Sequence, residues 1–488
     1  NVKLVSFLPS ERAQSVMAEG GINAALNTKD ENDSPEEHFT DTIKAACGLA
    51  DPNAVWGMTQ AAPELVHWLL KLGVKFNMSG YDDVDLRNFG GQKKKRTAFA
   101  QSDTGKQIMT AMIDAVRRKE ASGMVERFSH HSFLTLRLCG NICCGCVIRD
   151  EYSQETVELP GDAVIVATGG MHGLFGNTTG SLSNTGEVTA ELFRLGVPLA
   201  NGEMIQYHPT TVKCGGKRML ISEAARGEGG RLFAMKDGKQ WYFMEEKYPE
   251  LGNLMPRDIT AREIWKVSHE SEVFLDMTEI SEEIISNKLS GLADDCMTYL
   301  HKDIRKEPVS VLPGIHYFMG GILVDEQHRT PIQNLCAAGE CCAQYHGANR
   351  LGGNSLLGAL YGGRVAAKSA CEQADVVDLS CATQIDFPPA SQISEIKQLN
   401  KVMQETMGVV RNENTLLNGI QTVQALTGNL PLLGMAVLKS ALARKESRGA
   451  HWREDYPKSN DDDYLKTTVA RFDGKQIQIS FVPVPERR

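Results

Sequence analysis

Two short apolar segments that end in glycine constrain the fold of this chain more than any other feature. Residues 162–170 read DAVIVATGG, and residues 334–340 read NLCAAGE. An apolar run of this length among helical patterns is typical of a strand in a parallel sheet that is covered on both faces. Dinucleotides bind at the carboxyl ends of such strands, where glycine allows a close approach. We therefore predict an α/β fold in which both segments border a dinucleotide site.

The hydrophobic spacing along the rest of the chain predicts further strands and helices. Residues 2–8 are apolar and rich in valine, which predicts a strand, and residues 15–26 place a Gly-Gly turn before an alanine-rich helix start. Residues 461–463 are three aspartates and predict an acidic loop. Short strands are predicted within residues 125–159, and helices at residues 35–48, 55–72, 104–119 and 390–445.

The mixed pattern between the two glycine-ended segments predicts a second domain inserted into the first. We predict a dinucleotide-binding, Rossmann-like domain in two parts, an inserted α+β capping domain, and a helical and C-terminal domain. The predicted boundaries are residues 1–210 and 308–385 for the two parts, 211–307 for the capping domain and 386–488 for the last domain.

Composition excludes several classes of protein. The formal net charge of −9 at pH 7 argues against a nucleic-acid partner, although a local cationic pocket for an anion remains compatible with it. The longest apolar run, residues 430–438, is too short for a membrane span, which needs about 20 residues. The 12 cysteines are unevenly spaced, so we predict reduced thiols and a cytoplasmic location.

Two other clusters have a structural interpretation that we favour over a functional one. The basic run QKKKR at residues 92–96 is predicted to be a solvated loop, although it could contact an anion. Residues 139–146 read CGNICCGC and could suggest a metal site. Because these cysteines lie on alternating strands around a Gly-Asn turn, their thiols should point to different faces. No metal site is predicted.

Five separate motifs carry histidine, arginine or glutamate among glycine and proline. Each alone is more typical of a structural residue, but together they predict a receptor for a dicarboxylate, because arginine binds carboxylates through two hydrogen bonds and histidine donates another. The motifs are QYHPT with His208, SEAARGEGG with Ser222, Glu223 and Arg226, PRD with Arg257, HYFMGG with His316, and HGANRLGGNSLL with Arg350.

These motifs, together with ATGG and AAGE, resemble in their order and spacing the flavoprotein subunit of succinate dehydrogenase and fumarate reductase. The likeness covers about residues 1–470. The segments DLRNFGGQKKKRTAFAQSDTG and GKQWYFMEEKYPELGNLMPRD are most similar to the menaquinone-linked bacterial branch. The resemblance implies FAD as cofactor and the interconversion of fumarate and succinate.

The resemblance also implies a role for each motif. Arg257 would protonate the substrate carbon, and Glu223 and Arg226 would relay protons to it. His208, Ser222, His316 and Arg350 would hold the carboxylates, with Ser222 standing where the family usually has threonine. The residues implied or predicted to bind FAD are Ala18, Gly20, Gly21, Ala167, Thr168, Gly169, Glu340, Asn354, Ser355 and Leu356.

The sequence departs from the family pattern at two places. The G-x-G-x-x-G fingerprint is not found; it is expected on a strand before Val2, so the chain is expected to begin at the second strand of the dinucleotide fold. In addition, Gln14 takes the place of the histidine to which relatives often attach FAD covalently. We therefore predict non-covalent FAD and a bias toward fumarate reduction.

The resemblance implies an iron–sulfur protein subunit as electron partner. The charged segment at residues 444–453 is a candidate for part of that interface, or alternatively a solvated helix end. A membrane anchor subunit, and attachment through it to the cytoplasmic face of a membrane, are left open. Two other interpretations also stay open: an enzyme like L-aspartate oxidase, which has non-covalent FAD, and a structural subunit without flavin.

Overall fold

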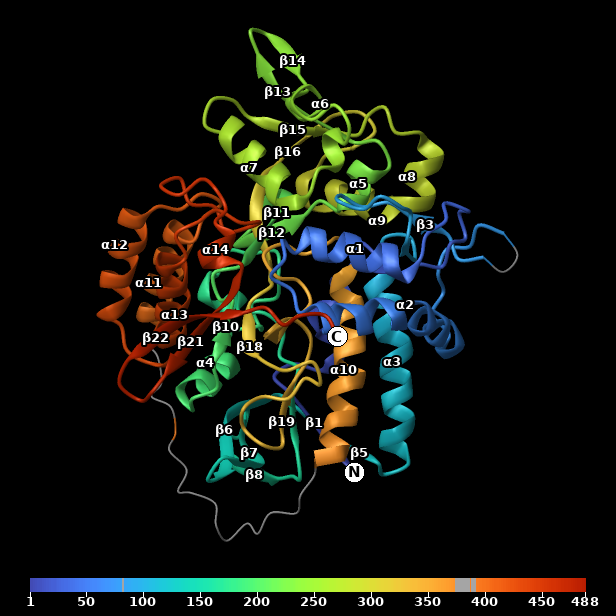
Figure 1. Cartoon of the computed structure of the whole chain (residues 1–488). Helices are drawn as coiled ribbons and strands as arrows, with labels where there is room; N and C mark the ends of the chain where they lie inside the picture. The colour runs from blue at the N-terminus through green and yellow to red at the C-terminus, as the bar shows by residue number, and fades with distance from the viewer. Residues whose placement is uncertain (81–82, 374–386, 388–391) are drawn as a thin grey trace.

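The computed structural model describes residues 1–80, 83–373, 387 and 392–488 (Figure 1). The predicted domain boundary at residues 385–386 lies outside the described residues. Two pairs of parallel strands form the centre of the first part of the chain. They are β1 (Val2–Ser6) with β5 (Val125–Ser129), and β9 (Val164–Val166) with β19 (Leu335–Ala337).

The pairing of β9 with β19 confirms that the two glycine-ended segments share a parallel sheet, although they are distant in sequence. The prediction that both are covered on each face is wrong for β9. Ile165 is 41% exposed and lines a cavity, because the face of β9 that carries it borders the open space described below.

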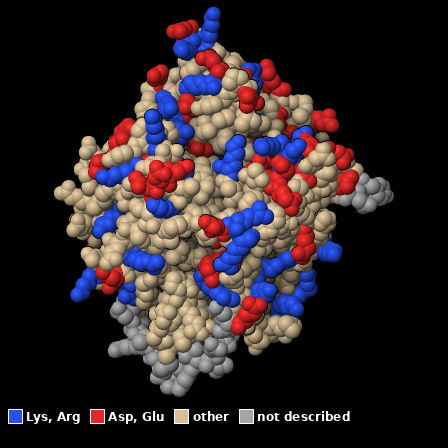
Figure 2. All heavy atoms as spheres, in the orientation of Figure 1, with Lys and Arg blue, Asp and Glu red and all other residues tan. Residues whose placement is uncertain are grey.

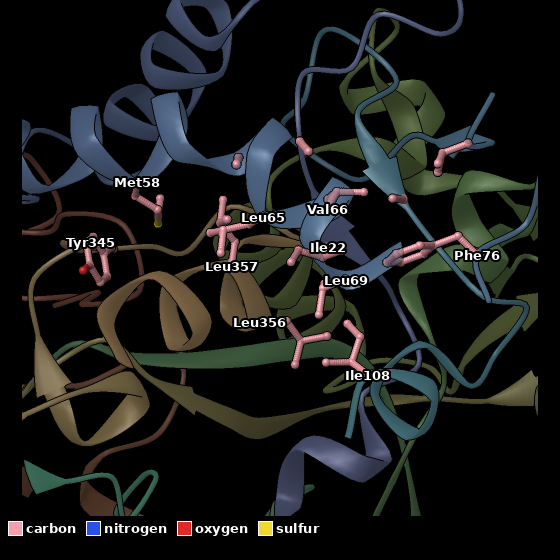
Figure 3. Packing of buried hydrophobic residues seen from close by; sticks show 14 of the residues in the cluster. Ile22, Met58, Leu65, Val66, Leu69, Phe76, Ile108, Tyr345, Leu356 and Leu357 are labelled. Atoms are coloured by element: carbon pink, nitrogen blue, oxygen red, sulfur yellow. The ribbon is translucent and has the colours of Figure 1, made fainter. Parts of the chain in front are cut away.

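Helices pack beside these strands and against one another, and their positions follow the predicted spacing. α1 (Pro35–Ala45), α2 (Pro52–Leu72) and α3 (Thr104–Ala121) confirm the predicted helices, and α10 (Asn354–Gln373) follows the Gly-rich motif. The Asp51 side chain caps α2 by accepting from the amides of Asn53 and Ala54. Figure 3 shows the resulting core, in which Leu65 of α2 and Leu356 of α10 pack near Ile22.

The predicted helix start after the Gly-Gly turn is wrong. The chain there forms β2 (Ile22–Asn23), which pairs with β4 (Thr97–Ala98), and β4 also pairs with β3 (Leu86–Arg87). Gly21 has a φ angle of 134°, and a Cβ atom there would lie 2.5 Å from the Ala98 carbonyl oxygen. This close approach of two backbones favours a strand over a helix.

A long strand leads from the centre into the inserted region. β11 (Ile205–Cys214) forms a hairpin with β12 (Lys217–Leu220) and pairs on its other side with β17 (Leu312–Phe318). The region above it has its own buried core (Figure 1). Its elements are β13 (Arg231–Lys236), β14 (Lys239–Trp241), β15 (Val273–Asp276), β16 (Val309–Ser310), α5 (Glu223–Gly227), α6 (Phe243–Lys247), α7 (Arg257–Val267), α8 (Glu282–Lys288), α9 (Ser290–Asp295) and a π-helical turn (Cys296–Leu300).

The C-terminal part is helical only in its first half. α11 (Ile393–Thr406), α12 (Glu413–Gln424) and α13 (Asn429–Ala443) confirm the predicted helices and pack with α4 (Glu187–Arg194). The remaining residues form a strand hairpin that the prediction of a helical domain missed, because their alternating side chains are partly charged. The hairpin strands β21 (Lys466–Phe472) and β22 (Ile477–Pro483) join β10 (Leu199–Ala200), β18 (Gly321–Leu323) and β20 (Cys342–Ala343) in one sheet.

One charged residue of a run that was predicted to be solvated is buried in ion pairs, although Lys93 and Lys95 of the same run are exposed. In the run at residues 92–96, Arg96 is 0% exposed and contacts Asp33 at 2.8 Å and Asp41 at 2.9 Å. The predicted acidic loop is instead the short helix α14 (Asp461–Tyr464). Figure 2 shows Lys and Arg interspersed with Asp and Glu over the visible face.

Most charged residues of the segment at residues 444–453 are also buried, so the prediction of a solvated helix end is wrong, whereas its role in docking a partner stays a prediction. Arg444 is 0% exposed and contacts Glu203 and Glu446, each at 2.7 Å, and Arg453 contacts Asp455 at 2.6 Å. The sequence could not reveal this, because Glu203 is distant along the chain.

The cysteine-rich segment lies on the meander of β6 (His131–Cys139), β7 (Ile142–Asp150) and β8 (Thr156–Pro160), which confirms the predicted short strands. Cys139 is disulfide-bonded, so the expectation of uniformly reduced thiols is wrong; spacing in sequence does not show which cysteines meet. Within the described ranges, no three His, Cys, Asp or Glu side chains are grouped to hold a metal ion. No described helix is both long and apolar enough to cross a membrane.

Candidate active site

A cavity of about 680 Å³ lies where the parallel strands, the start of α10 and the inserted region meet. Most of the residues predicted from the motifs line it, although they come from widely separated parts of the chain. Arg226 and Asn354 do not line the cavity and lie directly behind its wall. The predicted residues that line it are Ala18, Gly20, Gly21, Ala167, Thr168, Gly169, His208, Ser222, Glu223, Arg257, His316, Glu340, Arg350, Ser355 and Leu356.

Glu223 is the centre of a buried chain of charges. Its Oε2 accepts hydrogen bonds from Arg257 Nε at 2.8 Å and Nη2 at 2.6 Å, and its Oε1 accepts from Arg226 Nη2 and from the Gly90 amide, both at 3.2 Å. Burial opposes ionisation of this carboxyl, yet Arg257 and Arg226 hold its pKa below the ordinary value. Glu223 is therefore ionised between two guanidinium groups.

Local sequence explains this geometry. The Ser222 hydroxyl caps α5, so Glu223 and Arg226 lie three residues apart in one helical turn and meet. Pro256 precedes α7 and places Arg257 at its first position. Glycines leave room for the carboxylate: a Cβ atom would lie 2.7 Å from Oε1 if added at residue 90, and 2.8 Å from Oε2 if added at residue 352.

Sequence reasoning missed Gln206, which connects the arginines. Arg257 Nη1 donates to Gln206 Oε1 at 3.1 Å, and Gln206 Nε2 donates to the Arg350 carbonyl at 2.8 Å and to Asn349 Oδ1 at 3.0 Å. Gln206 precedes His208 by two residues on β11. That spacing, which places both on one face of a strand, is the signal that could have found it.

His208, His316 and Arg350 present hydrogen-bonding groups to the cavity. His208 Nε2 is buried and has no protein partner within the described residues, and the same holds for Arg350 Nε. His316 Nδ1 is 2.8 Å from the Thr179 hydroxyl, and its ring centroid is 5.1 Å from that of His208. The Arg350 guanidinium lies over the Tyr317 ring at 4.2 Å.

The position of His316 depends on a β-bulge. In the pairing of β11 with β17, Gln206 faces Tyr317 and Tyr207 faces Ile315, so His316 is the extra residue. Such a bulge re-aims a side chain, here into the cavity. Thr179 then fixes the orientation of the ring.

Burial and charge set the protonation of this group. Burial, followed by the neighbouring Arg257, lowers the pKa of both His208 and His316 well below the ordinary value, so both imidazoles are neutral at pH 7. Burial lowers the pKa of Arg350 to about 9, which leaves it cationic at pH 7. The site thus combines cationic guanidinium groups with neutral imidazoles, a combination that suits carboxylate groups.

Small residues and one carboxylate form the other end of the cavity. Gly169 adopts a φ angle of 73°, and Glu340 Oε1 accepts from the Phe318 amide at 3.0 Å. A Cβ atom on Gly170 would lie 2.5 Å from Glu340 Oε1. Asn354 Oδ1 accepts from Asn23 Nδ2 at 2.8 Å and is 2.9 Å from His38 Nε2, so it anchors the start of α10 behind the cavity.

Two further side chains line this end. Gln14 lies on a 3₁₀ turn (Gln14–Met17). Burial raises the pKa of Glu19 to about 8, helped by the negative charge of Asp295, and Glu19 Oε2 is buried with no protein partner in the described part of the chain. Glu19 is therefore mostly protonated at pH 7. Sequence reasoning did not identify Glu19, because only the fold brings Asp295 near it.

Comparison with known proteins agrees with the geometry. Residues 1–356 match the family described as FAD binding domain, and residues 426–487 match the family described as fumarate reductase flavoprotein C-term. The whole chain is 37% identical to the succinate dehydrogenase flavoprotein subunit of Bacillus subtilis, covering 94% of it. It is 31% identical to the 8-methylmenaquinol:fumarate reductase flavoprotein subunit of Wolinella succinogenes, again over the whole chain and 88% of that protein.

A solved structure of Escherichia coli quinol fumarate reductase superposes with a TM-score of 0.89, over 99% of this chain and 92% of that one, at 27% identity. Fold and cavity thus define a flavoprotein oxidoreductase with an FAD-binding domain, a capping domain and a C-terminal domain. The chain belongs to the flavoprotein subunits of the succinate dehydrogenase and fumarate reductase family. These relatives do not distinguish its branch, so the menaquinone-linked branch stays a prediction.

Proposed function

We propose that this chain interconverts fumarate and succinate with FAD, and that it works as a fumarate reductase. One observation carries the proposal. The buried chain of Arg257, Glu223 and Arg226 ends at the same cavity to which His208 and Arg350 present nitrogen atoms that have no partner among the described residues. A dicarboxylate needs cationic and hydrogen-bonding groups for its two ends, and its reduction needs a proton as well as two electrons.

The residues at the other end of the cavity fit FAD. Gly20, Gly21 and the segment from Ala167 to Gly169 form a wall of small residues, and Ser355 lies in the first turn of a 20-residue helix whose positive N-terminal end suits an anion. Glu340, which lines the same cavity, would accept hydrogen bonds from hydroxyl groups of the cofactor. Bound FAD would supply a hydride to one alkene carbon of fumarate.

The protein residues would supply the proton and the polarisation. Arg350, His316 and His208 would bind the carboxylates and draw electron density from the alkene, which favours attack by a hydride. An Arg257 guanidinium nitrogen would give a proton to the second carbon. Glu223 would then pass a replacement proton from Arg226 to Arg257. Arginine is a very weak acid, with a pKa of about 12.5 or more in water, so this transfer requires a strongly basic carbon in a closed site.

Gln14 supports non-covalent FAD and reduction as the favoured direction. An amide has no ring nitrogen that could form a histidyl bond to the flavin, and such a bond is expected to raise the flavin potential. A flavin without it would be the stronger reductant. For a two-electron couple, each 30 mV corresponds to about 1.4 kcal/mol, so a modest shift in potential decides the direction.

The flavin needs a route for electrons, and we propose an iron–sulfur protein subunit as partner. The relatives from Bacillus subtilis and Wolinella succinogenes are both named as flavoprotein subunits, which supports a multi-subunit complex. A cytoplasmic location, and attachment to the cytoplasmic face of a membrane through an anchor subunit, belong to the same proposal.

A flavin spectrum with a fumarate titration tests the proposal. We expect a yellow protein whose flavin spectrum shifts with fumarate and with malonate, and turnover with fumarate faster than oxidation of succinate at matched driving force. A colourless protein under reconstitution with FAD would favour a structural subunit, and oxidation of L-aspartate without fumarate reduction would favour the aspartate oxidase alternative. Flavin that stays with acid-precipitated protein after washing would contradict non-covalent binding.

A further inference from the structure

A hairpin at the rim of the cavity carries a lysine to which neither the motifs nor the comparisons assign a role. We propose that Lys217 attracts the dianionic substrate and guides it into the cavity, and so favours dicarboxylates over acids of lower charge. This inference rests on the proposed function.

The hairpin is fixed beside the dicarboxylate end of the cavity. Its turn is Gly215–Gly216, and Lys217 pairs in register with Cys214. The Arg218 amide donates to the Thr178 carbonyl at 3.2 Å, and the next residue, Thr179, holds His316. The hairpin residues that line the cavity are Cys214, Lys217, Arg218, Met219 and Leu220.

Lys217 is a free positive charge at this rim. Its side chain is exposed, and it has no ion pair or hydrogen bond with any described residue. The neighbouring Arg218 is different, because its Nε donates to the Thr211 hydroxyl at 2.5 Å and its Nη2 donates to the Leu312 carbonyl at 3.3 Å. Lys217 is thus the rim cation whose charged group is free to meet a ligand.

The negative charge of the protein explains how a cation at the rim could help a dianion to bind. The chain carries a net charge of −9, which repels a dianion at long range. Of the acidic residues that line the cavity, Glu223 is paired with arginines and Glu19 is mostly neutral at pH 7, which leaves Asp295 and Glu340. A cation at the rim offsets this negative charge and raises the local concentration of substrate. Ionic strength screens the effect, with a Debye length of about 8 Å at 0.15 M salt.

The chain offers a matched control on the same hairpin. Lys213 is exposed and carries the same charge, but it does not line the cavity. Lys217→Gln and Lys213→Gln therefore change the net charge of the protein equally and differ only in place. Lys217→Arg keeps the charge and tests for rescue, and Lys217→Glu reverses it.

We expect Lys217→Gln to raise the KM for fumarate by about two- to fivefold with kcat unchanged, to weaken the malonate-induced shift of the flavin spectrum by a similar factor, and to flatten the salt dependence of kcat/KM. Lys217→Glu should have a larger effect on each of these quantities than Lys217→Gln. Lys217→Arg should give values close to wild type, and Lys213→Gln should leave all three quantities unchanged. A monocarboxylate enoate should respond less to Lys217→Gln than fumarate does.

Equal effects of Lys217→Gln and Lys213→Gln would overturn the inference, and so would a Lys217→Gln variant that lowers kcat alone. If the wild-type holoprotein binds neither fumarate nor malonate, the proposed function itself fails. If it binds both but the two lysine variants behave alike, only the role of Lys217 fails.

Discussion

Replacing Glu223 by glutamine tests the buried proton path most directly. The carboxylate accepts four hydrogen bonds, of which Oε2 takes two from Arg257 and Oε1 takes one each from Arg226 and the Gly90 amide. In glutamine, an amide nitrogen replaces one of the two carboxylate oxygens. This nitrogen cannot accept a hydrogen bond, so the two hydrogen bonds that the replaced oxygen accepts would be lost. At about 1.5–3 kcal/mol for each bond to a charged group, the loss is about 3–6 kcal/mol. This agrees with about 3–5 kcal/mol for a broken buried ion pair.

Glu223→Gln should therefore lower both stability and turnover, but not dicarboxylate affinity to the same degree. We expect fumarate reduction to fall by about 10² to 10⁴, as for the loss of a proton-transfer group. Arg350 and His316 remain in place, so malonate should still shift the flavin spectrum. Rapid reduction kinetics and urea unfolding of the holoprotein measure the two effects.

The control for this experiment is Glu228→Gln. Glu228 follows α5, and its replacement by glutamine removes the same charge. Its Oε2 atom lies 3.1 Å from Lys288 Nζ, so it is paired with a lysine and not with the cavity arginines. It should leave turnover near the wild-type value. Turnover of Glu223→Gln within threefold of wild type, with flavin bound, would refute the reasoning.

Three further perturbations probe other parts of the cavity. Arg350→Ala should weaken fumarate and malonate binding by about tenfold to hundredfold, the equivalent of one charge-assisted interaction of about 1.5–3 kcal/mol, measured by flavin titration. Burial raises the pKa of Glu19 from 4.5 to about 8, so the folded protein keeps a proton that the unfolded chain releases. Wild-type stability should therefore fall relative to Glu19→Gln as pH rises through this window and stay level above it, measured by urea unfolding. Gly170→Ala places a Cβ atom 2.5 Å from Glu340 Oε1 and should reduce FAD content.

Each of these has an outcome that contradicts it. Unchanged titration midpoints in Arg350→Ala would place the dicarboxylate elsewhere. A stability difference between wild type and Glu19→Gln that does not vary with pH would show that Glu19 keeps its ordinary pKa in the folded protein. Wild-type FAD content in Gly170→Ala would show that Glu340 can move without loss of the cofactor.

Local patterns predicted the helices and the parallel strands because these depend on residues near one another in sequence. The spacing of α2 and the apolar run of β9 are of this kind. The burial of Arg96 and Arg444 could not be predicted, because their carboxylate partners Asp33 and Glu203 are set by the tertiary fold. A charged run in a sequence thus indicates solvent exposure only when no distant partner exists.

The candidate site also contains residues that local sequence could predict and residues whose position depends on the tertiary fold. Residue types in short motifs predicted that Arg257 and Glu223 belong to a receptor for a dicarboxylate, and the structure brings these two residues within hydrogen-bonding distance. Gln206 was missed because a neutral amide in a strand carries no compositional signal. The orientation of His316 also could not be predicted, because a β-bulge depends on the register between two strands rather than on one of them.

That bulge determines how this segment can change during evolution. Between Tyr317 and Ile315, β17 carries one residue more than the stretch of β11 that it faces. Paired residues share a face of the sheet, so Tyr317 and Ile315 lie on opposite faces although they are two residues apart. Deleting His316 would therefore restore a regular ladder and keep both pairings, and it would remove only the cavity-facing imidazole. An insertion or deletion at a regularly paired position of β17 would instead shift the register and exchange the cavity-facing and outward-facing residues.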